Sequence, residues 1–196
     1  MAVNEALEAH DGPWTVEELL ARDEHPSRAR VELIGGSLVV SPAPSWPHQA
    51  ASSELWYQLK SAIRAAKAPY RVAAAVNVRS ADQLFIPDIV VADAAAVTME
   101  TVVVDADSVL LIVEIVSPGN TAADRVWKPN AYARLGLPHY WRLEPSHGKP
   151  ELVVHALDGD HYREIAKITG TSQVPVGDAF SVEVDVPQLF DDLEQI

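Results

Sequence analysis

The sequence predicts one mixed α/β domain in which helices flank a central β-sheet and a β-hairpin lies near the N-terminus. Three observations support this fold class. Residues 109–116 are almost entirely apolar, which is typical of a central strand buried on both faces. Leucine and isoleucine recur every four residues in segment 48–66, which indicates a helix with one apolar face. Gly35-Gly36 separates two short apolar runs, and this pattern favours a two-residue hairpin turn.

Length and composition limit the number of domains and the class of protein. The chain has 196 residues, of which 48% are hydrophobic and 22% are charged, as expected for a globular domain. We expect residues 1–13 to form a flexible leader and residues 14–196 a single folded domain. The chain has no cysteine, no apolar run long enough to span a membrane and no basic region typical of a signal peptide. A cytoplasmic location is therefore expected.

The charge balance bears on possible partners. Fifteen basic residues against 28 acidic ones give a formal net charge of −13. Because nucleic-acid binding depends largely on neutralising phosphates, this charge provides no overall attraction for DNA. A nuclease can still be acidic where a divalent cation balances its carboxylates, so the charge counts against a nucleic-acid partner without excluding one.

Capping and turn residues predict the elements of the N-terminal third. Thr15 and Glu18 have the spacing of a capping box, which predicts a short helix directly after Thr15. Residues 31–34 and 37–40 are expected to be the strands of the hairpin. Three prolines in segment 41–47 predict a loop, and the amphipathic helix follows it.

The rest of the chain is expected to alternate strands with one further helix. That helix is predicted over residues 122–135, with Gly136 closing it. Asp158-Gly159 predicts a hairpin turn, and the tail from Pro187 predicts a last helical turn. Further strands are expected at residues 70–78, 84–92, 139–144, 151–157 and 161–168.

Three carboxylates interrupt apolar segments, where an unpaired charge would be costly to bury. They are Asp88, Glu114 and Glu32, each flanked by aliphatic residues. Buried carboxylates are usually paired, hydrogen-bonded or bound to a metal. Simpler interpretations are that Glu32 faces solvent and that Asp88, next to Pro87, shapes the end of a strand. Glu114 fits a solvent-facing position least well, because it lies inside the most apolar strand.

Two carboxylates on adjacent central strands could share one divalent cation. Ligation by oxygen alone selects a hard ion, so Mg²⁺ or Mn²⁺ is favoured over Zn²⁺. Such an ion activates water and neutralises charge in phosphodiester hydrolysis. That chemistry also needs a fixed positive charge, which Arg125 or Lys128 of the following helix could supply. Asp124 and Tyr132 lie four residues on either side of Lys128, so the three share one helix face.

The order of several short motifs resembles that of a known family. A Pro-Asp pair followed by a glutamate in an apolar strand resembles the PD-(D/E)xK nuclease motif. The full set resembles the Uma-type putative restriction endonucleases of that restriction-endonuclease-like superfamily, from about Trp14 to Phe190. In chain order the matching segments are residues 31–35, 41–48, 87–91 and 113–118, then Asp124, Lys128 and Tyr132, and finally residues 136–141 and 184–190.

This resemblance implies a restriction-endonuclease-like core and a role for each matching residue. Asp88 and Glu114 would be metal ligands, with the backbone carbonyl of Ile115 as a possible third. Glu32 would be an accessory acidic residue near the metal. Lys128 would replace the usual motif lysine. The implied protein is a Mg²⁺-dependent deoxyribonuclease with Mg²⁺ or Mn²⁺ as cofactor and DNA as partner.

The chain departs from the superfamily pattern at three places. Val116 stands two residues after Glu114, where the motif lysine normally lies, as is typical of the Uma-type branch. Gly35-Gly36-Ser37 replaces the more usual acidic turn after the first strand. Pro129 directly follows Lys128 and disfavours helical geometry there. The helix could instead begin at Lys128, which would move this side chain to the rim of the site.

Other conspicuous residues have simpler interpretations. His48 follows the proline loop at a helix start, so a structural or exposed role is favoured over a role in the site. The aromatic residues Trp127, Tyr132, Tyr140 and Trp141 are expected to pack in the core rather than to stack on bases. The sequence contains neither a serine-nucleophile elbow nor a glycine-rich phosphate loop.

Two classes of function therefore remain open. The first is a metal-dependent endonuclease that hydrolyses DNA, with Asp88, Glu114 and Lys128 at its centre. The second is a catalytically inactive nuclease-fold protein that acts as a binding or assembly module. The net charge and the Lys128-Pro129 pair favour the second, whereas the retained acidic residues and lysine favour the first. We also expect a homodimer, because cutting both strands of DNA is often done by two symmetric subunits.

Overall fold

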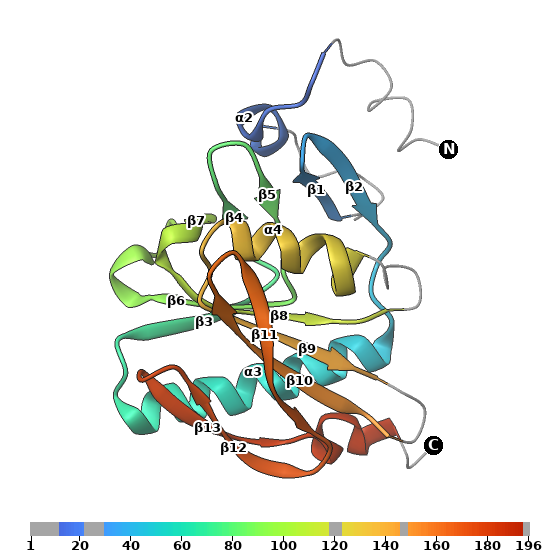
Figure 1. Ribbon diagram of the computed structural model, residues 1–196, viewed down its shortest axis with the longest axis vertical. Helices are drawn as coiled ribbons and strands as arrows, with labels where there is room; N and C mark the ends of the chain where they lie inside the picture. The colour runs from blue at the N-terminus through green and yellow to red at the C-terminus, as the bar shows by residue number, and fades with distance from the viewer. Residues whose placement is uncertain (1–11, 22–29, 118–122, 146–148, 194–196) are drawn as a thin grey trace.

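The computed structural model describes residues 12–21, 30–117, 123–145 and 149–193 as a mixed α/β fold (Figure 1). The helices are α2 (Val16–Leu20), α3 (Trp46–Ala66) and α4 (Lys128–Arg134), with the π-helical turn η3 (Ala123–Trp127) and the 3-10 turns η1 (Ala94–Ala96), η2 (Ala106–Ser108) and η4 (Pro187–Leu193). The strands are β1 (Arg30–Ile34), β2 (Ser37–Ser41), β3 (Tyr70–Ala74), β4 (Asn77–Arg79), β5 (Leu84–Phe85), β6 (Ile89–Asp93), β7 (Val103–Asp105), β8 (Val109–Ile115), β9 (His139–Glu144), β10 (Glu151–Asp158), β11 (His161–Ile168), β12 (Thr171–Val176) and β13 (Phe180–Asp185).

These strands form three sheets in the described part of the chain. The largest has the order β11-β10-β9-β8-β6-β3, the second has the order β2-β1-β5-β4-β7, and β12 pairs with β13. β8 pairs antiparallel with β6 and parallel with β9, and η3 and α4 make the crossover that a parallel pair requires. The prediction of a mixed sheet flanked by helices is confirmed.

The N-terminal elements have the predicted local signals. The side chain of Thr15 accepts a hydrogen bond from the Glu18 backbone N–H, and the Glu18 side chain caps the Thr15 N–H in return. β1 and β2 form the predicted hairpin. Gly35 and Gly36 have φ values of 57° and 77°, the left-handed conformation that this two-residue turn requires. The expected leader, residues 1–13, lies mostly outside the described residues.

The two faces of the six-stranded sheet are covered differently (Figure 1). On one face, α3 packs Leu55, Leu59 and Ile63 against β6 and β8, and β12–β13 extends this core. On the other face lie α4 and residues of the five-stranded sheet. β8 is buried along nearly its whole length, as expected for a central strand. α3 begins at Trp46, inside the segment predicted as loop, because Pro47 is tolerated in a first helical turn.

Two segments that were each predicted as one continuous strand are divided into two strands in the structure, so these two predictions are wrong. The segment predicted as a strand over 70–78 is divided into β3 and β4, with Ala75 at φ 52° between them. The segment predicted over 84–92 is divided into β5 and β6, with Pro87 between them. In both cases the halves belong to different sheets. β7, β12 and β13 were not predicted, although β12 and β13 supply buried valines to the core around α3.

The C-terminal predictions are largely confirmed. Gly136 has φ 75°, and the N–H groups of Gly136 and Leu137 donate to the carbonyls of Ala133 and Tyr132, which closes α4. The turn at Gly159 joins β10 to β11, and η4 provides the last helical turn. No helix within the described ranges is long and apolar enough to cross a membrane.

Candidate functional site

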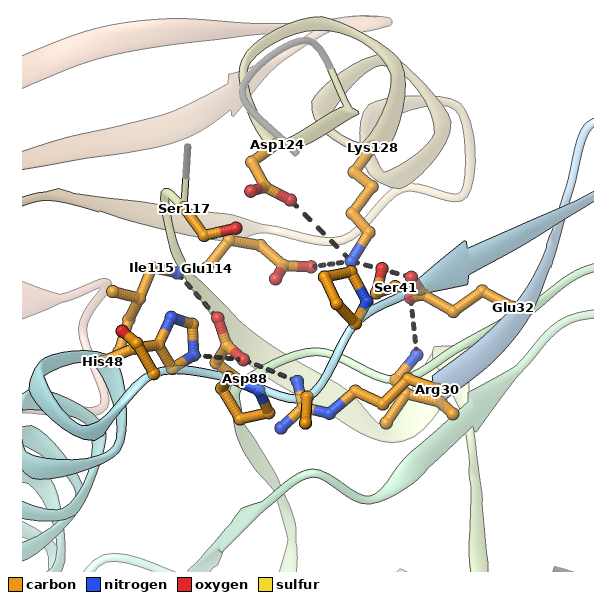
Figure 2. Close-up of a pocket in the computed structure, with 15 residues that line it drawn as sticks. Arg30, Glu32, Ser41, His48, Asp88, Glu114, Ile115, Ser117, Asp124 and Lys128 are labelled. Atoms are coloured by element: carbon orange, nitrogen blue, oxygen red, sulfur yellow. Dashed lines mark hydrogen bonds and ion pairs between the residues drawn. The ribbon is translucent and has the colours of Figure 1, made fainter. Parts of the chain in front are cut away.

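The candidate site is a pocket of about 190 Å³ at one end of β6 and β8 (Figure 2). Side chains from five separate parts of the chain meet there, which is why a cluster of charges can lie beside a largely apolar sheet. The charged and histidine side chains that line it are Arg30 and Glu32 from β1, His48 from α3, Asp88 just before β6, Glu114 from β8, and Asp124 and Lys128 from η3 and α4.

Strand register places the two central carboxylates together. In the antiparallel β6–β8 ladder Ile89 lies opposite Val113, so one step further along the ladder Asp88 lies opposite Glu114. Both carboxylates then face the α4 side of the sheet, because side chains alternate between the faces of a strand. The sheet thus brings into one pocket two residues that are 26 positions apart in the sequence.

Asp88 is buried and makes three contacts through its carboxylate. Its Oδ1 accepts from Arg30 Nη1 at 2.7 Å and lies 3.0 Å from His48 Nε2, while its Oδ2 accepts from the Ile115 N–H at 2.8 Å. Burial by itself raises the pKa of Asp88, but the hydrogen bonds from His48, Ile115 and Arg30 outweigh it and lower that pKa. Asp88 is therefore an anion. Ile115 makes this contact through its N–H group, so its carbonyl, which the resemblance implied as a metal ligand, takes no part in it.

Glu114 is almost fully buried and is held from the helix side. Its Oε1 accepts hydrogen bonds from Lys128 Nζ at 3.0 Å and from the Tyr132 hydroxyl at 2.6 Å. Burial raises the pKa of Glu114 to about 8; Lys128 opposes this rise, and the neighbouring carboxylates reinforce it. Glu114 therefore takes up a proton near neutral pH unless further positive charge enters the pocket.

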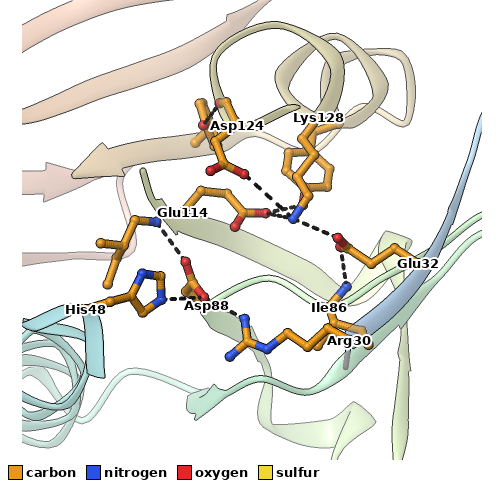
Figure 3. A network of polar contacts seen from close by, with 11 residues as sticks. Arg30, Glu32, His48, Ile86, Asp88, Glu114, Asp124 and Lys128 are labelled. Carbon is orange, nitrogen blue, oxygen red and sulfur yellow. Dashed lines mark hydrogen bonds and ion pairs between the residues drawn. The ribbon is translucent and has the colours of Figure 1, made fainter. Parts of the chain in front are cut away.

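Lys128 lies at the centre of the acidic cluster (Figure 3). Its Nζ is 3.0 Å from a carboxylate oxygen of Glu32, 3.0 Å from one of Glu114 and 3.9 Å from one of Asp124, and its side chain is only 5% exposed. Burial by itself lowers the pKa of Lys128, but these three carboxylates outweigh it and raise that pKa. Lys128 is therefore a permanent cation at neutral pH.

The helix start at Pro129 does not move Lys128 away from the site. α4 does begin at Lys128, with Pro129 in its first turn, as the proline suggested. The residues before it form the π-helical turn η3 rather than a loop. Helical geometry thus continues upstream of the proline, and the expectation that the lysine would lie on the rim is wrong.

Glu32 and Asp124 complete the acidic cluster. Glu32 is 1% exposed, so the alternative that it faces solvent is wrong. Its second oxygen accepts the Ile86 N–H at 2.8 Å, which ties the hairpin to the segment just before Asp88. Asp124 lies beside Lys128, and burial raises its pKa to about 6. The hydroxyl of Tyr140 donates to the Asp124 carbonyl at 2.6 Å and fixes the η3 backbone.

The charge balance of the pocket fits a divalent cation. Four carboxylates face the two basic side chains Lys128 and Arg30, so the pocket holds more acidic than basic groups and can accept further positive charge. Oxygen donors of this kind suit a hard ion. Among the described residues, however, no three His, Asp or Glu side chains are arranged to reach one ion together. The carboxylate oxygens are donors suited to a divalent cation, but some of their contacts with Lys128 or Arg30 must change before such an ion can bind. The four carboxylates are those of Asp88, Glu114, Glu32 and Asp124, and the two basic side chains are those of Lys128 and Arg30.

Three of the charged or histidine residues that line the pocket were outside the site predicted from sequence. Arg30 was not considered, and His48 was assigned a structural or exposed role. Asp124 was noted for its spacing from Lys128 and its place among the family-matching residues, without a role in the site. A signal existed for Arg30, because it lies two residues before Glu32 in a strand and so shares its face. Arg125, the other candidate cation, instead pairs with Glu144 and does not line the pocket.

The aromatic residues divide into two groups. Tyr132, Tyr140 and Trp141 are 0% exposed, which confirms the prediction that they pack in the core. Trp127 is 58% exposed, so that prediction is wrong for this residue. It is the last residue of the π-helical turn and directly precedes Lys128.

Comparison with known proteins identifies a shared family and fold. A family model described as Uma2, putative restriction endonuclease, matches residues 16–188. A solved structure described as a putative nuclease belonging to DUF820 from Anabaena variabilis ATCC 29413 superposes with a TM-score of 0.74 at 20% identity, covering 91% of this chain and 98% of that chain. No curated protein matches the chain. The superposition shows a shared fold and confirms the predicted fold class.

Proposed function

The chain belongs to the Uma2 family of putative restriction endonucleases, and from that premise we propose that it hydrolyses DNA phosphodiester bonds with a divalent cation, Mg²⁺ or Mn²⁺. The observation that carries the proposal is the cluster of four buried carboxylates around Asp88 and Glu114, which face only two basic side chains, Lys128 and Arg30. A protein gains little stability from burying such a cluster, because each charge loses its hydration. Because the cluster contributes little to stability, a reaction that depends on a bound cation explains why these carboxylates are buried together.

The proposed cation ligands are Asp88 and Glu114, with backbone of Ile115 nearby and Glu32 as an accessory carboxylate. When bound there, a divalent cation neutralises phosphate charge and lowers the pKa of a coordinated water. Asp88 is suited to this role because its lowered pKa keeps it ionised. His48 and the Ile115 N–H hold it in orientation. Tyr132 holds Glu114 in the same way from α4.

Lys128 is proposed to act as a fixed positive charge rather than as a proton acceptor. Its raised pKa keeps it protonated, so it cannot take a proton from water at neutral pH. A buried cation held by three carboxylates is well placed to stabilise charge that develops on a phosphate group. It also limits repulsion among the carboxylates themselves.

DNA and a second copy of the chain are the proposed partners. With a net charge of −13, attraction to DNA must come from the pocket and its bound cation rather than from the overall surface. Two symmetric subunits would allow both strands to be cut. Sedimentation equilibrium of the purified protein tests the dimer directly, because a monomer at micromolar concentration would contradict it.

A second candidate function is a nuclease-fold protein that binds partners without cutting. The arrangement of the described carboxylates favours it, since Lys128 and Arg30 already engage them and no three donors converge on one point. In this case the pocket would be a buried ion-pair network that fixes the positions of the hairpin and α4.

Calorimetric titration of Mn²⁺ into the wild type and Glu114→Gln, combined with cleavage of supercoiled plasmid, separates the two functions. We expect stoichiometric binding and metal-dependent nicking by the wild type, and loss of both in the variant, with cleavage falling by at least about 10³-fold. Glu183→Gln is a matched control, because Glu183 is an exposed glutamate of β13 outside the pocket. No Mn²⁺ binding by the wild type at millimolar concentration would overturn the nuclease proposal.

A further inference from the structure

One oxygen of Asp88 has both of its acceptor positions in use. Oδ1 contacts Arg30 Nη1 at 2.7 Å and His48 Nε2 at 3.0 Å. A carboxylate oxygen offers about two lone pairs, so a cation that binds this oxygen must displace one of the two groups. The other oxygen of Asp88 is held by the Ile115 N–H.

Arg30 is the group that can leave most easily. Its side chain is 22% exposed, compared with 10% for His48 and 5% for Lys128. His48 is fixed in the first turns of α3, and Lys128 is held by three carboxylates, whereas the long side chain of Arg30 reaches Asp88 from the strand β1. A guanidinium is also weakly hydrated and keeps its charge, so moving it to another anion is less costly than removing the buried lysine.

We infer that Arg30 competes with the divalent cation for Oδ1 of Asp88 and, once displaced, contacts a phosphate of the substrate. This rests on the proposed function, which supplies both the cation and the phosphate. The Arg30 guanidinium and the divalent cation repel each other, so both cannot contact the same oxygen of Asp88. The planar guanidinium then has donors that match phosphate oxygens in pairs, and the side chain already lines the pocket that the phosphate must enter.

The inference predicts changes of opposite sign when Arg30 is neutralised. In Arg30→Gln the competing charge is gone, so Mn²⁺ should bind at least about tenfold more tightly. Cleavage at saturating Mn²⁺ should fall by at least about tenfold, chiefly through a higher KM for DNA, because the phosphate contact is lost. A residue that only supports the fold would weaken metal binding and cleavage together.

Calorimetric titration of Mn²⁺ and steady-state cleavage of plasmid are measured on the wild type, Arg30→Gln and Arg79→Gln. Arg79 is the matched control, because it also lies 2.7 Å from an aspartate, Asp105, but outside the pocket. Arg79→Gln should behave as the wild type. Arg30→Lys keeps the charge and should retain wild-type Mn²⁺ affinity, which separates the effect of charge from that of folding.

The outcomes distinguish this inference from the proposed function. If the wild type binds and cleaves but Arg30→Gln binds Mn²⁺ equally or more weakly, the competition is refuted and the nuclease function stands. If neither protein binds Mn²⁺, both proposals fail. Should Arg30→Gln fold poorly, ¹⁵N-arginine spectra of the wild type during Mg²⁺ titration give an independent readout. The Arg30 guanidinium signals should shift as Mg²⁺ binds, and an unchanged signal at saturation would contradict the inference.

Discussion

Both faces of the central sheet bury apolar side chains, but the α4 face also buries a cluster of charged groups. On the α3 face Leu55 and Leu59 are 0% exposed and pack against the aliphatic side chains of β6 and β8. On the α4 face Glu114 is 2% and Lys128 4% exposed, and they belong to a cluster with three further carboxylates. The same two strands therefore contribute both an apolar core and a charged pocket.

The apolar core stabilises the fold, whereas the charged pocket carries the proposed function. Burial of apolar side chains stabilises the folded state in proportion to the surface area removed from water. Truncating such a side chain therefore lowers the free energy of unfolding. Buried charges contribute little net stability even when well paired, but removing one partner leaves the others uncompensated. We therefore expect variants on the α3 face to change stability alone, and variants on the α4 face to change stability in a manner that depends on pH and metal.

The largest effect is expected from removing the central cation. Lys128→Met leaves three carboxylates without their counter-ion and should lower the free energy of unfolding by about 3–5 kcal/mol at pH 8. Mn²⁺ at about 100 times its dissociation constant should restore about 2.7 kcal/mol. Urea denaturation with and without Mn²⁺ measures both quantities. Lys167→Met, which removes a half-exposed lysine of β11, serves as control and should change little. Equal losses in the two variants would remove the distinction between the faces.

A large but purely structural effect is expected on the α3 face. Leu59→Ala removes a fully buried side chain and should lower the free energy of unfolding by about 2–5 kcal/mol, through lost transfer energy and the cavity left behind. The affinity for Mn²⁺ should not change, because the pocket lies on the other face of the sheet. Urea denaturation and calorimetric titration test this pair of expectations. A weakened Mn²⁺ affinity in a folded variant would show that the faces are coupled.

A smaller effect should appear as pH dependence of the charged face. Glu114 has its pKa raised from 4.5 to about 8, so the folded protein without metal holds a proton that the unfolded chain has lost, and stability should fall as pH rises across that window. Metal binding needs the ionised carboxylate, so Mn²⁺ affinity should rise by up to about tenfold per pH unit below pH 8 and then level off. Titrations in buffers of different ionisation enthalpy count the released proton. An affinity independent of pH from 6 to 8 would argue against Glu114 as a ligand.

The smallest effect concerns a helix that belongs to neither face. Thr15→Ala removes the capping-box hydroxyl of α2 and should lower the free energy of unfolding by about 1 kcal/mol. α2 packs through Val16 and Leu19 against Leu33 of the hairpin that also carries Glu32. Mn²⁺ affinity should stay within experimental error of the wild type. A lower affinity would instead indicate that α2 helps to position the hairpin at the pocket.

Much of the fold could be predicted because its signals are local. The capping box at Thr15, the glycine pair of the hairpin and the apolar run of β8 each depend on a few adjacent residues. The division of segments 70–78 and 84–92 between two sheets could not be predicted, because a residue pattern shows which face is buried but not which sheet buries it. β12 and β13 were missed although their buried valines alternate with polar residues, the pattern of a half-buried strand, because Pro175 and the turn formers Gly177-Asp178 interrupt the segment.

The pocket was predicted in part for the same physical reason. Asp88, Glu114 and Glu32 were conspicuous because each interrupts an apolar run, and the structure brings all three into the pocket that Lys128 also lines. Arg30 and His48 lie at the ends of elements, where a charged or polar residue normally faces water, so the spacing of Arg30 from Glu32 was the one local signal for either residue. Their contact with Asp88 arises only when the hairpin and α3 meet the sheet.

The π-helical turn η3 restricts where residues can be inserted or deleted near the pocket. A π-turn corresponds to one residue inserted into an α-helix, and here it precedes Pro129, which has no N–H to donate. Deleting one residue from this turn would allow regular α-helix but would rotate Asp124 by about 100° relative to Lys128. Insertions or deletions should therefore be excluded between these two residues, whereas a hairpin tip such as Gly159 should accept them.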